Sequence, residues 1–472
     1  MVDLAIRGGR IVAAGGVAVR DLGIVDGRIV AITLPGGLPE AEREIDATGK
    51  LVIPGGIDPH VHSNSPVPRP DGSWDLSFPP PVVSRAALFG GTTTLMDFAM
   101  CRPGMTLAES IELQTEAWRD GLCDFSHHIQ LEGAVPPEII AEMPEAIEAG
   151  YPSFKIYTTD VKPTGHEIGR IDHGRILALL RQAARSGGIL VIHAEDDDLV
   201  MYAYEELARV GRTGFEEMPA IHSVMSEDLA FRRITQLAGY VEGAAVYLVH
   251  TGTRVGVDII AEARFRGQAI YGETLHQYLC FTADAYHRPD GVMYHTYPSL
   301  KSADDQARLW SGLADGTLST VATDEMGTSR EVKVEQRHAS DAVGGHVGVE
   351  TRLAVIYTEG VVKRGMSLER FVEVTSTNAA KIFGMYPTKG AIEVGADADL
   401  VVFDPTVRRV LRAEDLHGSD YSIWDGWETH GWPETTILRG KVAVERGQLQ
   451  AHPGDGRRVQ RKLSSPVTGP GA

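Results

Sequence analysis

Eight short apolar runs alternate with amphipathic segments through the middle of the chain, and this alternation constrains the fold more than any other feature. The segments between the runs contain helix candidates at 106–121, 136–150 and 174–188. Continuous apolar runs separated by amphipathic helices predict a parallel sheet that is covered by helices. The eight runs occupy residues 51–58, 92–99, 124–131, 153–159, 189–194, 245–251, 269–275 and 318–324.

Eight strand–helix units in about 270 residues match the usual size of a (β/α)8 TIM barrel. We therefore expect an α/β fold in which residues 54–385 form the barrel. An open doubly wound sheet is the competing architecture, because it shows the same alternation. Connections of more than about 12 residues are usually functional or disordered, and the loops after barrel strands build the active-site face. The long connections lie at 63–81, 160–171, 283–301 and 325–347.

The two ends of the chain show short β-type runs broken by Gly-Gly, Asp-Gly and Thr-Gly turns. This pattern favours antiparallel hairpins, which are marginal in isolation. Residues 1–53 and 386–472 are therefore expected to combine into one small β-sandwich domain. The basic, Gly- and Pro-rich tail at 452–472 is either a flexible end or an arm on a neighbouring subunit.

Composition and charge exclude several classes of protein. Hydrophobic residues make up 43% and charged residues 23% of the 472 residues, as in globular chains. A net charge of −19 argues against nucleic-acid binding. No secretory signal and no apolar stretch long enough for a membrane helix is visible. Three scattered cysteines suit a reducing compartment, so we expect a cytoplasmic protein.

Two histidines close the first apolar run in the sequence Asp58-Pro59-His60-Val61-His62. Residues i and i+2 of a strand project to the same side, so both imidazoles can reach one point. Two neutral imidazoles aimed together suit a zinc-class metal. The alternative is a pair of histidines that share a polar strand end.

Three further metal-binding side chains stand at the ends of other predicted strands, namely His193, His250 and Asp324. Barrel enzymes place catalytic residues at the carboxyl ends of their strands. A single histidine after an apolar run is more often a core or cap residue. Four histidines and one carboxylate at the same end of the barrel indicate a metal site.

Lys155 lies inside the apolar run 153–159, where a charged amine is unfavourable. One interpretation is a salt-bridged lysine. The other is a carbamylated lysine, in which the cation becomes a carboxylate-like anion able to bridge two metals.

Several motifs, in this order and at these spacings, resemble those of the cyclic amidohydrolases, the family of hydantoinases and dihydropyrimidinases. The similarity extends over residues 3 to about 465. It is carried by GGIDPHVH, GGTTTLMDFA, SFKIYT, VIHAED, YLVHTG, GETLHQYL, VATDE, TSTNAAKIFGMYPTKGAIEVGADADLVVFDP, DYSIWDGWETHG and GRRVQRK.

This resemblance implies a binuclear zinc hydrolase that acts on C–N bonds of cyclic amides. His60, His62 and Asp324 would bind one Zn²⁺ and His193 and His250 the other, with Lys155 as a bridging N6-carboxylysine. Asp324 would be the catalytic proton shuttle. The implied reaction converts a 5-substituted hydantoin to an N-carbamoyl amino acid in a homotetramer or homodimer. Alternatives are a dihydropyrimidinase, an allantoinase-like or lactam-hydrolysing relative, or a metal-free scaffold.

The chain departs from the family pattern around the expected substrate. Asp160 replaces the family tyrosine, with Tyr157 the nearest tyrosine, and Glu325 and Leu275-His276 are also departures. The two substrate-reading segments appear as 297–301 (YPSLK) and 344–348 (GGHVG). We therefore predict substrate contacts from Tyr157, Asp160, Tyr297, Gly344 and His346, and from Trp74 and Phe78 in the loop 63–81, whereas His127, His128 and His222 are expected to be structural.

Overall fold

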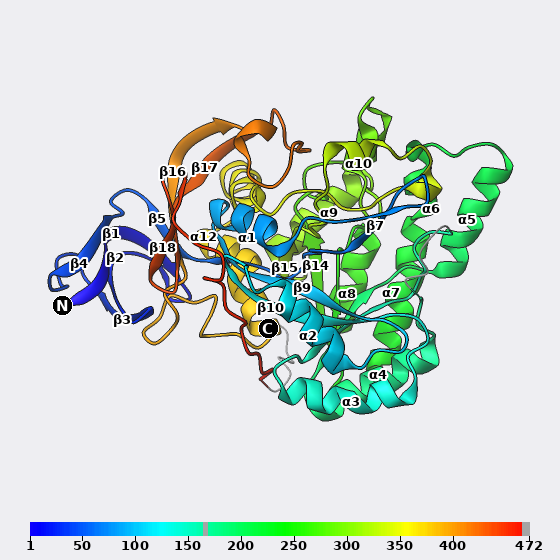
Figure 1. Cartoon of the computed structure of the whole chain (residues 1–472), viewed down its shortest axis with the longest axis horizontal. Helices are drawn as coiled ribbons and strands as arrows, with labels where there is room; N and C mark the ends of the chain where they lie inside the picture. The colour runs from blue at the N-terminus through cyan, green and yellow to red at the C-terminus, as the bar shows by residue number, and fades with distance from the viewer. Residues whose placement is uncertain (164–168, 465–472) are drawn as a thin grey trace.

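Two sheets organise the protein in the computed structural model, which describes residues 1–163 and 169–464. Figure 1 shows the β-rich part with the N-terminus on one side and the larger helix-covered part on the other. Among the described residues, no helix is long and apolar enough to cross a membrane.

The larger part contains eight parallel strands in the order β15-β14-β13-β12-β11-β10-β9-β6. This order follows the sequence without reversal, and a bridge between Val61 and Glu325 joins the two ends of the series. The TIM barrel is therefore confirmed and the doubly wound alternative is wrong. The strands are β6 (Gly56–Asp58), β9 (Thr92–Cys101), β10 (Asp124–Leu131), β11 (Ser153–Tyr157), β12 (Ile189–His193), β13 (Ala245–Leu248), β14 (Ala269–Leu275) and β15 (Thr320–Ala322).

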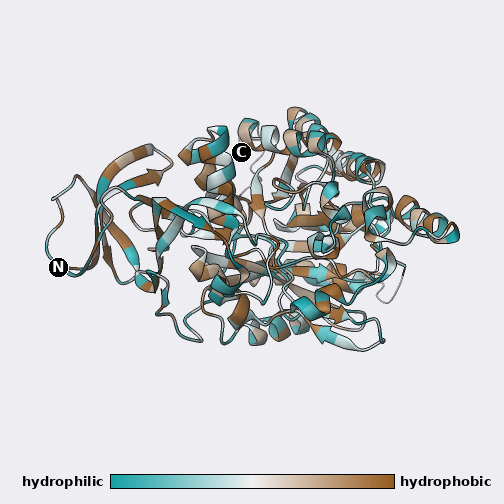
Figure 2. Ribbon diagram, turned by 90° about the horizontal axis from the view of Figure 1, so that it is seen from above, coloured by the Kyte–Doolittle hydropathy of each residue, from teal (hydrophilic) through white to brown (hydrophobic). Residues whose placement is uncertain are grey.

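Helices cover the outside of these strands (Figures 1 and 2) and place their apolar faces against them. Local signals fix their ends: Thr106 and Glu109 form a capping box, and Gly187 ends a helix at φ +79°. The main helices are α1 (Pro80–Phe89), α2 (Leu107–Ala117), α3 (Pro137–Glu148), α4 (His173–Ser186), α5 (Asp197–Arg209), α7 (Val224–Gly239), α8 (Arg254–Phe265) and α9 (Ala303–Asp315). Shorter helices are α6 (Met218–Ile221), α10 (Arg330–Val334), α11 (Arg352–Ile356), α12 (Leu368–Val372) and α13 (Asn378–Ile382).

The first predicted strand, 51–58, is divided between the two sheets. Its first half, β5 (Leu51–Pro54), pairs with strands of the other sheet, and only β6 belongs to the barrel. The break falls at Gly55, where a Cβ atom would lie 2.1 Å from Thr93 Oγ1. A single strand through 51–58 was therefore the wrong prediction, because the chain crosses between sheets at this contact.

The second sheet has nine strands and unites the two ends of the chain. In this sheet β5 pairs in parallel with β1 from the N-terminal end of the chain. It pairs in antiparallel fashion with β16 from the C-terminal end. The domain boundaries expected between residues 53 and 54 and between residues 385 and 386 stay predictions. The strands are β1 (Val2–Ala13), β2 (Gly16–Val25), β3 (Arg28–Thr33), β4 (Ala41–Asp46), β5, β16 (Leu400–Val410), β17 (Glu428–Leu438), β18 (Lys441–Glu445) and β19 (Gln448–Leu449).

The described part of the C-terminal tail packs on the barrel of its own chain. Val459 N donates to Phe125 O at 2.7 Å, and Phe125 N donates to Arg457 O at 3.0 Å. Arg461 is buried and donates to Ser126 Oγ, Ser153 Oγ and His127 O. Up to residue 464 the tail is thus neither a free end nor an arm on another subunit, and residues 465–472 lie outside the described residues.

Candidate metal centre and active site

A cavity of about 580 Å³ opens at the carboxyl ends of the barrel strands. This is the face at which TIM barrels carry their active sites. All six predicted metal ligands line the cavity: His60, His62, Lys155, His193, His250 and Asp324.

His60, His62 and Asp324 form the tightest group of possible ligands. The Nε2 atoms of His60 and His62 lie 3.2 Å apart. Asp324 Oδ1 lies 3.0 Å from His60 Nε2 and 3.2 Å from His62 Nε2. Among the described residues, these three form a group that could hold a metal ion. The bridge between Val61 and Glu325 explains their closeness, because it aligns the segments that follow β6 and β15.

The hydrogen bonds around His60 show that a cation fits this group. His60 Nδ1 lies 2.7 Å from Glu273 Oε1, which also approaches the backbone N–H of His250 at 3.0 Å. Because a carboxylate only accepts, Nδ1 is the donor, and Nε2 of a neutral imidazole presents a lone pair. That lone pair, the ring of His62 and the Asp324 carboxylate would repel one another unless a proton or a metal lay between them. The donor set of two imidazoles and one carboxylate suits zinc.

The other three predicted ligands are His193, His250 and Lys155. The rings of His193 and His250 lie 4.4 Å apart between centroids, and that of His250 is 5.6 Å from His60. Lys155 is fully buried, and its Nζ has no hydrogen-bond partner among the described residues. Burial lowers the pKa of Lys155 to about 8. No ion pair is formed by this amine in the part of the chain that the structure describes, so the salt-bridged interpretation is wrong.

Backbone strain marks two of these positions. Asp324 has φ +53° and His250 has φ +37°, in the left-handed region that non-glycine residues rarely adopt. Such residues concentrate at functional sites, because the surrounding structure must hold them there.

Two buried glutamates that sequence reasoning missed orient the histidines. Glu273 accepts from His60 Nδ1 and from the Tyr247 hydroxyl, and Glu195 lies 2.9 Å from His193 Nε2. Carboxylates of this kind fix the tautomer of metal-binding imidazoles. The available signals were a carboxylate inside the apolar run 269–275 and another two residues after His193.

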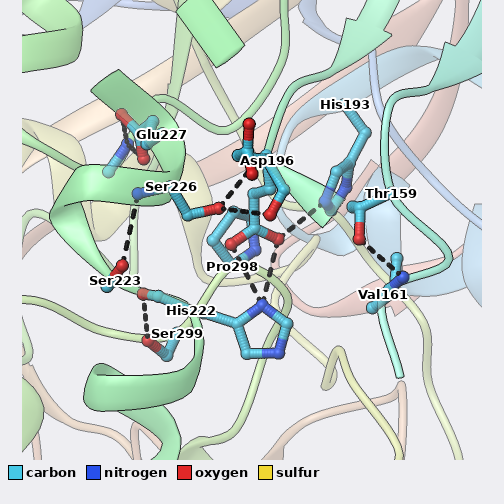
Figure 3. A network of polar contacts seen from close by, with 12 residues as sticks. Thr159, Val161, His193, Asp196, His222, Ser223, Ser226, Glu227, Pro298 and Ser299 are labelled. Atoms are coloured by element: carbon cyan, nitrogen blue, oxygen red, sulfur yellow. Dashed lines mark hydrogen bonds and ion pairs between the residues drawn. The ribbon is translucent and has the colours of Figure 1, made fainter. Parts of the chain in front are cut away.

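His222, predicted to be structural, belongs to the same polar network as His193, which Figure 3 shows. Its Nδ1 lies 3.0 Å from both Glu195 carboxylate oxygens, and its Nε2 is 3.2 Å from the Tyr204 hydroxyl. Burial would raise the pKa of Glu195, but His222 and His193 hold it well below its usual range. Glu195 is therefore an anion that anchors the ring of His193.

His128 supports the segment before His60 from the opposite side. Its Nε2 lies 3.0 Å from Pro59 O, so this nitrogen is the donor and Nδ1 accepts from the Ser153 hydroxyl at 2.7 Å. Arg461 Nη1 in turn donates to Ser153 Oγ at 2.9 Å. A directional chain of hydrogen bonds thus connects the C-terminal tail with the segment that carries His60 and His62.

The predicted substrate residues divide into two groups. Tyr157, Tyr297, Gly344 and Trp74 line the cavity. Asp160, His346 and Phe78 are not part of its lining. Asp160 accepts from the backbone N–H of Arg170 at 2.7 Å, His346 is fully buried, and Phe78 packs against the core.

One wall of the cavity is apolar. It includes Trp74 and Leu76 of the hairpin formed by β7 (Pro66–Pro68) and β8 (Trp74–Leu76), and Met326 and Val343 from the loop after β15. Trp74 is 48% exposed. The opening of the cavity therefore offers an apolar surface to part of a bound molecule.

Comparisons with known proteins agree with this geometry. Residues 51–443 match the model of the amidohydrolase family. The chain is 34% identical to a D-hydantoinase of Geobacillus stearothermophilus, over 97% of this chain and 96% of that protein. The solved D-hydantoinase of Bacillus sp. AR9 is 32% identical with a TM-score of 0.92, covering 98% of this chain and all of that one. A dihydropyrimidinase of Brevibacillus agri NCHU1002 is also 32% identical with a TM-score of 0.92, over 98% and 99% of the two chains.

Proposed function

The chain belongs to the amidohydrolase family, and on that premise we propose that it is a metal-dependent hydrolase that opens the ring of a cyclic amide or imide, as a hydantoinase does. The observation that carries the proposal is the cluster of His60, His62 and Asp324 in a cavity that Lys155, His193 and His250 also line. A scaffold without metal would have no need to retain this set. Relatives named hydantoinase and dihydropyrimidinase support the reaction class.

Two zinc ions are proposed as the metals. His60, His62 and Asp324 would hold one, and His193 and His250 the other. Lys155 would bridge them as N6-carboxylysine, which forms when a neutral amine attacks CO₂ and releases one N–H proton. The buried, unpartnered amine supports this modification, because the resulting carbamate would have cations to pair with. When bound, the metals supply Lewis acidity and make water nucleophilic near neutral pH.

Asp324 moves the proton in this reaction. Its carboxylate lies beside His60 and His62 and lines the cavity, so it could exchange a proton with a water bound there. It accepts a proton as the water oxygen bonds to the acyl carbon. It then returns the proton to the ring nitrogen as the C–N bond breaks, so that the elements of one water are added.

The proposed substrate is a 5-substituted hydantoin, which would give an N-carbamoyl amino acid. The apolar wall of Trp74, Leu76 and Met326 offers a surface for the ring substituent. Dihydropyrimidines, allantoin-like ureides and lactams are the alternatives within the same chemistry.

A hydrolysis panel tests this proposal. Zinc-loaded wild type and Asp324→Asn are assayed on 5-substituted hydantoins, dihydropyrimidines, allantoin and lactams. We expect the wild type to open at least one class, and Asp324→Asn to lose at least about 100-fold in kcat, since general acid–base groups contribute that much or more. A protein with two bound zinc ions that opens no ring would contradict the proposal. A homotetramer or homodimer and a cytoplasmic location stay predictions. Light scattering would measure the number of subunits in solution.

A further inference from the structure

Lys333 is a buried lysine that the proposed chemistry does not use. It lies in α10, and its side chain is 0% exposed. Its Nζ donates to three backbone carbonyls, those of His295 at 2.9 Å, Val343 at 2.6 Å and Gly345 at 2.5 Å. No carboxylate pairs with it among the residues that the structure describes.

The three carbonyls belong to two loops beside the cavity. Val343 and Gly345 line it, and His295 precedes the lining residue Tyr297 by two positions. A further carbonyl of the same segment, that of Ala342, accepts from Lys162 Nζ at 2.8 Å and from the Tyr297 hydroxyl at 3.1 Å. Side chains from the loops after β11, β14 and β15 therefore meet at the segment 342–345.

An ammonium group suits this position because its three N–H donors match three acceptors. Burial of a cation without a counterion is unfavourable, so the arrangement persists only where all donors are satisfied. Replacing the amine by an apolar group would leave three buried carbonyls without this donor, two of them in residues that line the cavity. The two loops would then lose their common anchor.

The carbonyl bonds also determine which backbone groups remain for a ligand. Gly344 lines the cavity, and its N–H has no acceptor in the described ranges 1–163 and 169–464. This N–H belongs to the same peptide unit as the Val343 carbonyl, so the ammonium at that carbonyl polarises it and strengthens the donor. A Cβ atom at 344 would lie 2.4 Å from the Tyr297 ring, so only glycine fits this close approach.

We propose that Lys333 is a positioning residue for substrate recognition: it holds the loops 295–297 and 343–345 so that the Gly344 N–H can donate to the substrate carbonyl that is not hydrolysed. This inference rests on the proposed function for the identity of the ligand. The positioning of the loops by Lys333 does not depend on it. An interaction with a non-reacting carbonyl is present in ground state and transition state alike, so its loss raises KM more than it lowers kcat.

The first test measures the loops without any ligand. Hydrogen–deuterium exchange is compared in wild type, Lys333→Met and the control Lys363→Met, whose side chain is 51% exposed. Faster exchange of peptides covering 342–348 and 294–300 in Lys333→Met alone is the expected result. Unchanged exchange in these peptides, in a folded variant with wild-type zinc content, overturns the inference even if the enzyme hydrolyses cyclic amides.

The second test uses the best substrate of the hydrolysis panel. We expect KM to rise about tenfold in Lys333→Met, with kcat within about twofold of wild type and a smaller rise in Lys333→Gln, which keeps an N–H donor. An equal fall in kcat and kcat/KM would overturn the recognition role. If Lys333→Met does not fold, hydrogen–deuterium exchange of the wild type is compared with and without the hydrolysis product. Slower exchange of the Gly344 amide in the presence of the product supports the inference, and unchanged exchange of this amide overturns it. If no cyclic amide is hydrolysed, the proposed function is wrong. The exchange measurement without ligand still tests whether Lys333 holds the two loops in place.

Discussion

In the proposed metal centre Lys155 is the side chain on which the chemistry depends most, because it is a buried amine that lines the cavity together with the four histidines. Its Nζ lies over the rings of Phe98 and Tyr157, at 5.4 and 4.6 Å from the ring centroids. A permanent cation there would repel bound metals, whereas a carbamate would attract them.

Lys155→Ala is therefore expected to lose most of its zinc and activity. Short carboxylic acids or bicarbonate should restore part of both by supplying the missing bridge, and Lys155→Arg should not respond, because it keeps a positive charge. Zinc per chain by atomic absorption is the measurement. Full zinc content in Lys155→Ala would rule out a bridging role.

The sequence predicted which side chains meet in the cavity, because five of the six end or directly follow an apolar run and Lys155 lies inside one, and a barrel brings such positions together. It did not predict the tautomer of His60 or His193. The tautomers depend on Glu273 of β14 and on Glu195, two residues after His193, and tertiary contacts set the orientation of both carboxylates. Asp160 shows a second reason why sequence patterns do not place every side chain. It replaces a family tyrosine, but its orientation is set by the backbone N–H of Arg170, which no pattern in the sequence reveals.

At the scale of elements, the tail after β19 is part of the barrel wall. Arg461 is 1% exposed and satisfies oxygens of Ser126, Ser153 and His127. The composition of the tail favoured a mobile or intersubunit segment, and its docking escaped prediction because it depends on acceptors more than 300 residues away in sequence.

Arg461→Ala should lower the free energy of unfolding by about 3 kcal/mol, because buried acceptors lose their donors. Urea unfolding monitored by circular dichroism measures this. Arg457→Ala, in the same tail but exposed, is the control and should change little. Equal stability of the two variants would show that the buried guanidinium contributes nothing.

The loops anchored by Lys333 should respond to pH. Burial, with Lys162 adding to it, lowers the pKa of Lys333 to about 7. The other titratable groups facing it are His295 and His346; burial lowers their pKa values, so both stay neutral above pH 6. As pH rises through about 7, Lys333 loses a proton and one carbonyl loses its donor.

KM of the wild type should therefore increase between pH 6 and 8.5 relative to Lys333→Met, which has no proton to lose. The ratio of the two KM values across this range is the measurement, and Lys162 is present in both proteins. A constant ratio would show that the charge of Lys333 does not affect substrate binding.

At the scale of the whole molecule, the barrel presents a mixed cavity: a cluster of histidines with Lys155 and Asp324 on one side, and an apolar wall that includes Trp74 and Leu76 on the other. The fold was predictable because the alternation of eight runs is strong, whereas the substrate was not, because it depends on loops whose side chains are placed by tertiary contacts. Trp74 lines the cavity as predicted, but Phe78, four residues later, packs into the core.

Trp74→Ala should reduce kcat/KM for aryl-substituted hydantoins about tenfold and leave unsubstituted hydantoin nearly unchanged, because only the larger ring substituent contacts the indole. The ratio of kcat/KM for the two substrates is the readout. Equal losses on both would place Trp74 outside the substituent site.

The central claim is that a metal held by these histidines opens a cyclic amide, and removal and return of the metal tests it most directly. Ring opening is measured on the best substrate of the panel in three samples: zinc-loaded, chelator-treated, and treated then reloaded with zinc and bicarbonate. The account predicts activity in the first, its loss in the second and its recovery in the third, in proportion to zinc bound per chain. Ring opening that persists in folded protein without metal would contradict it.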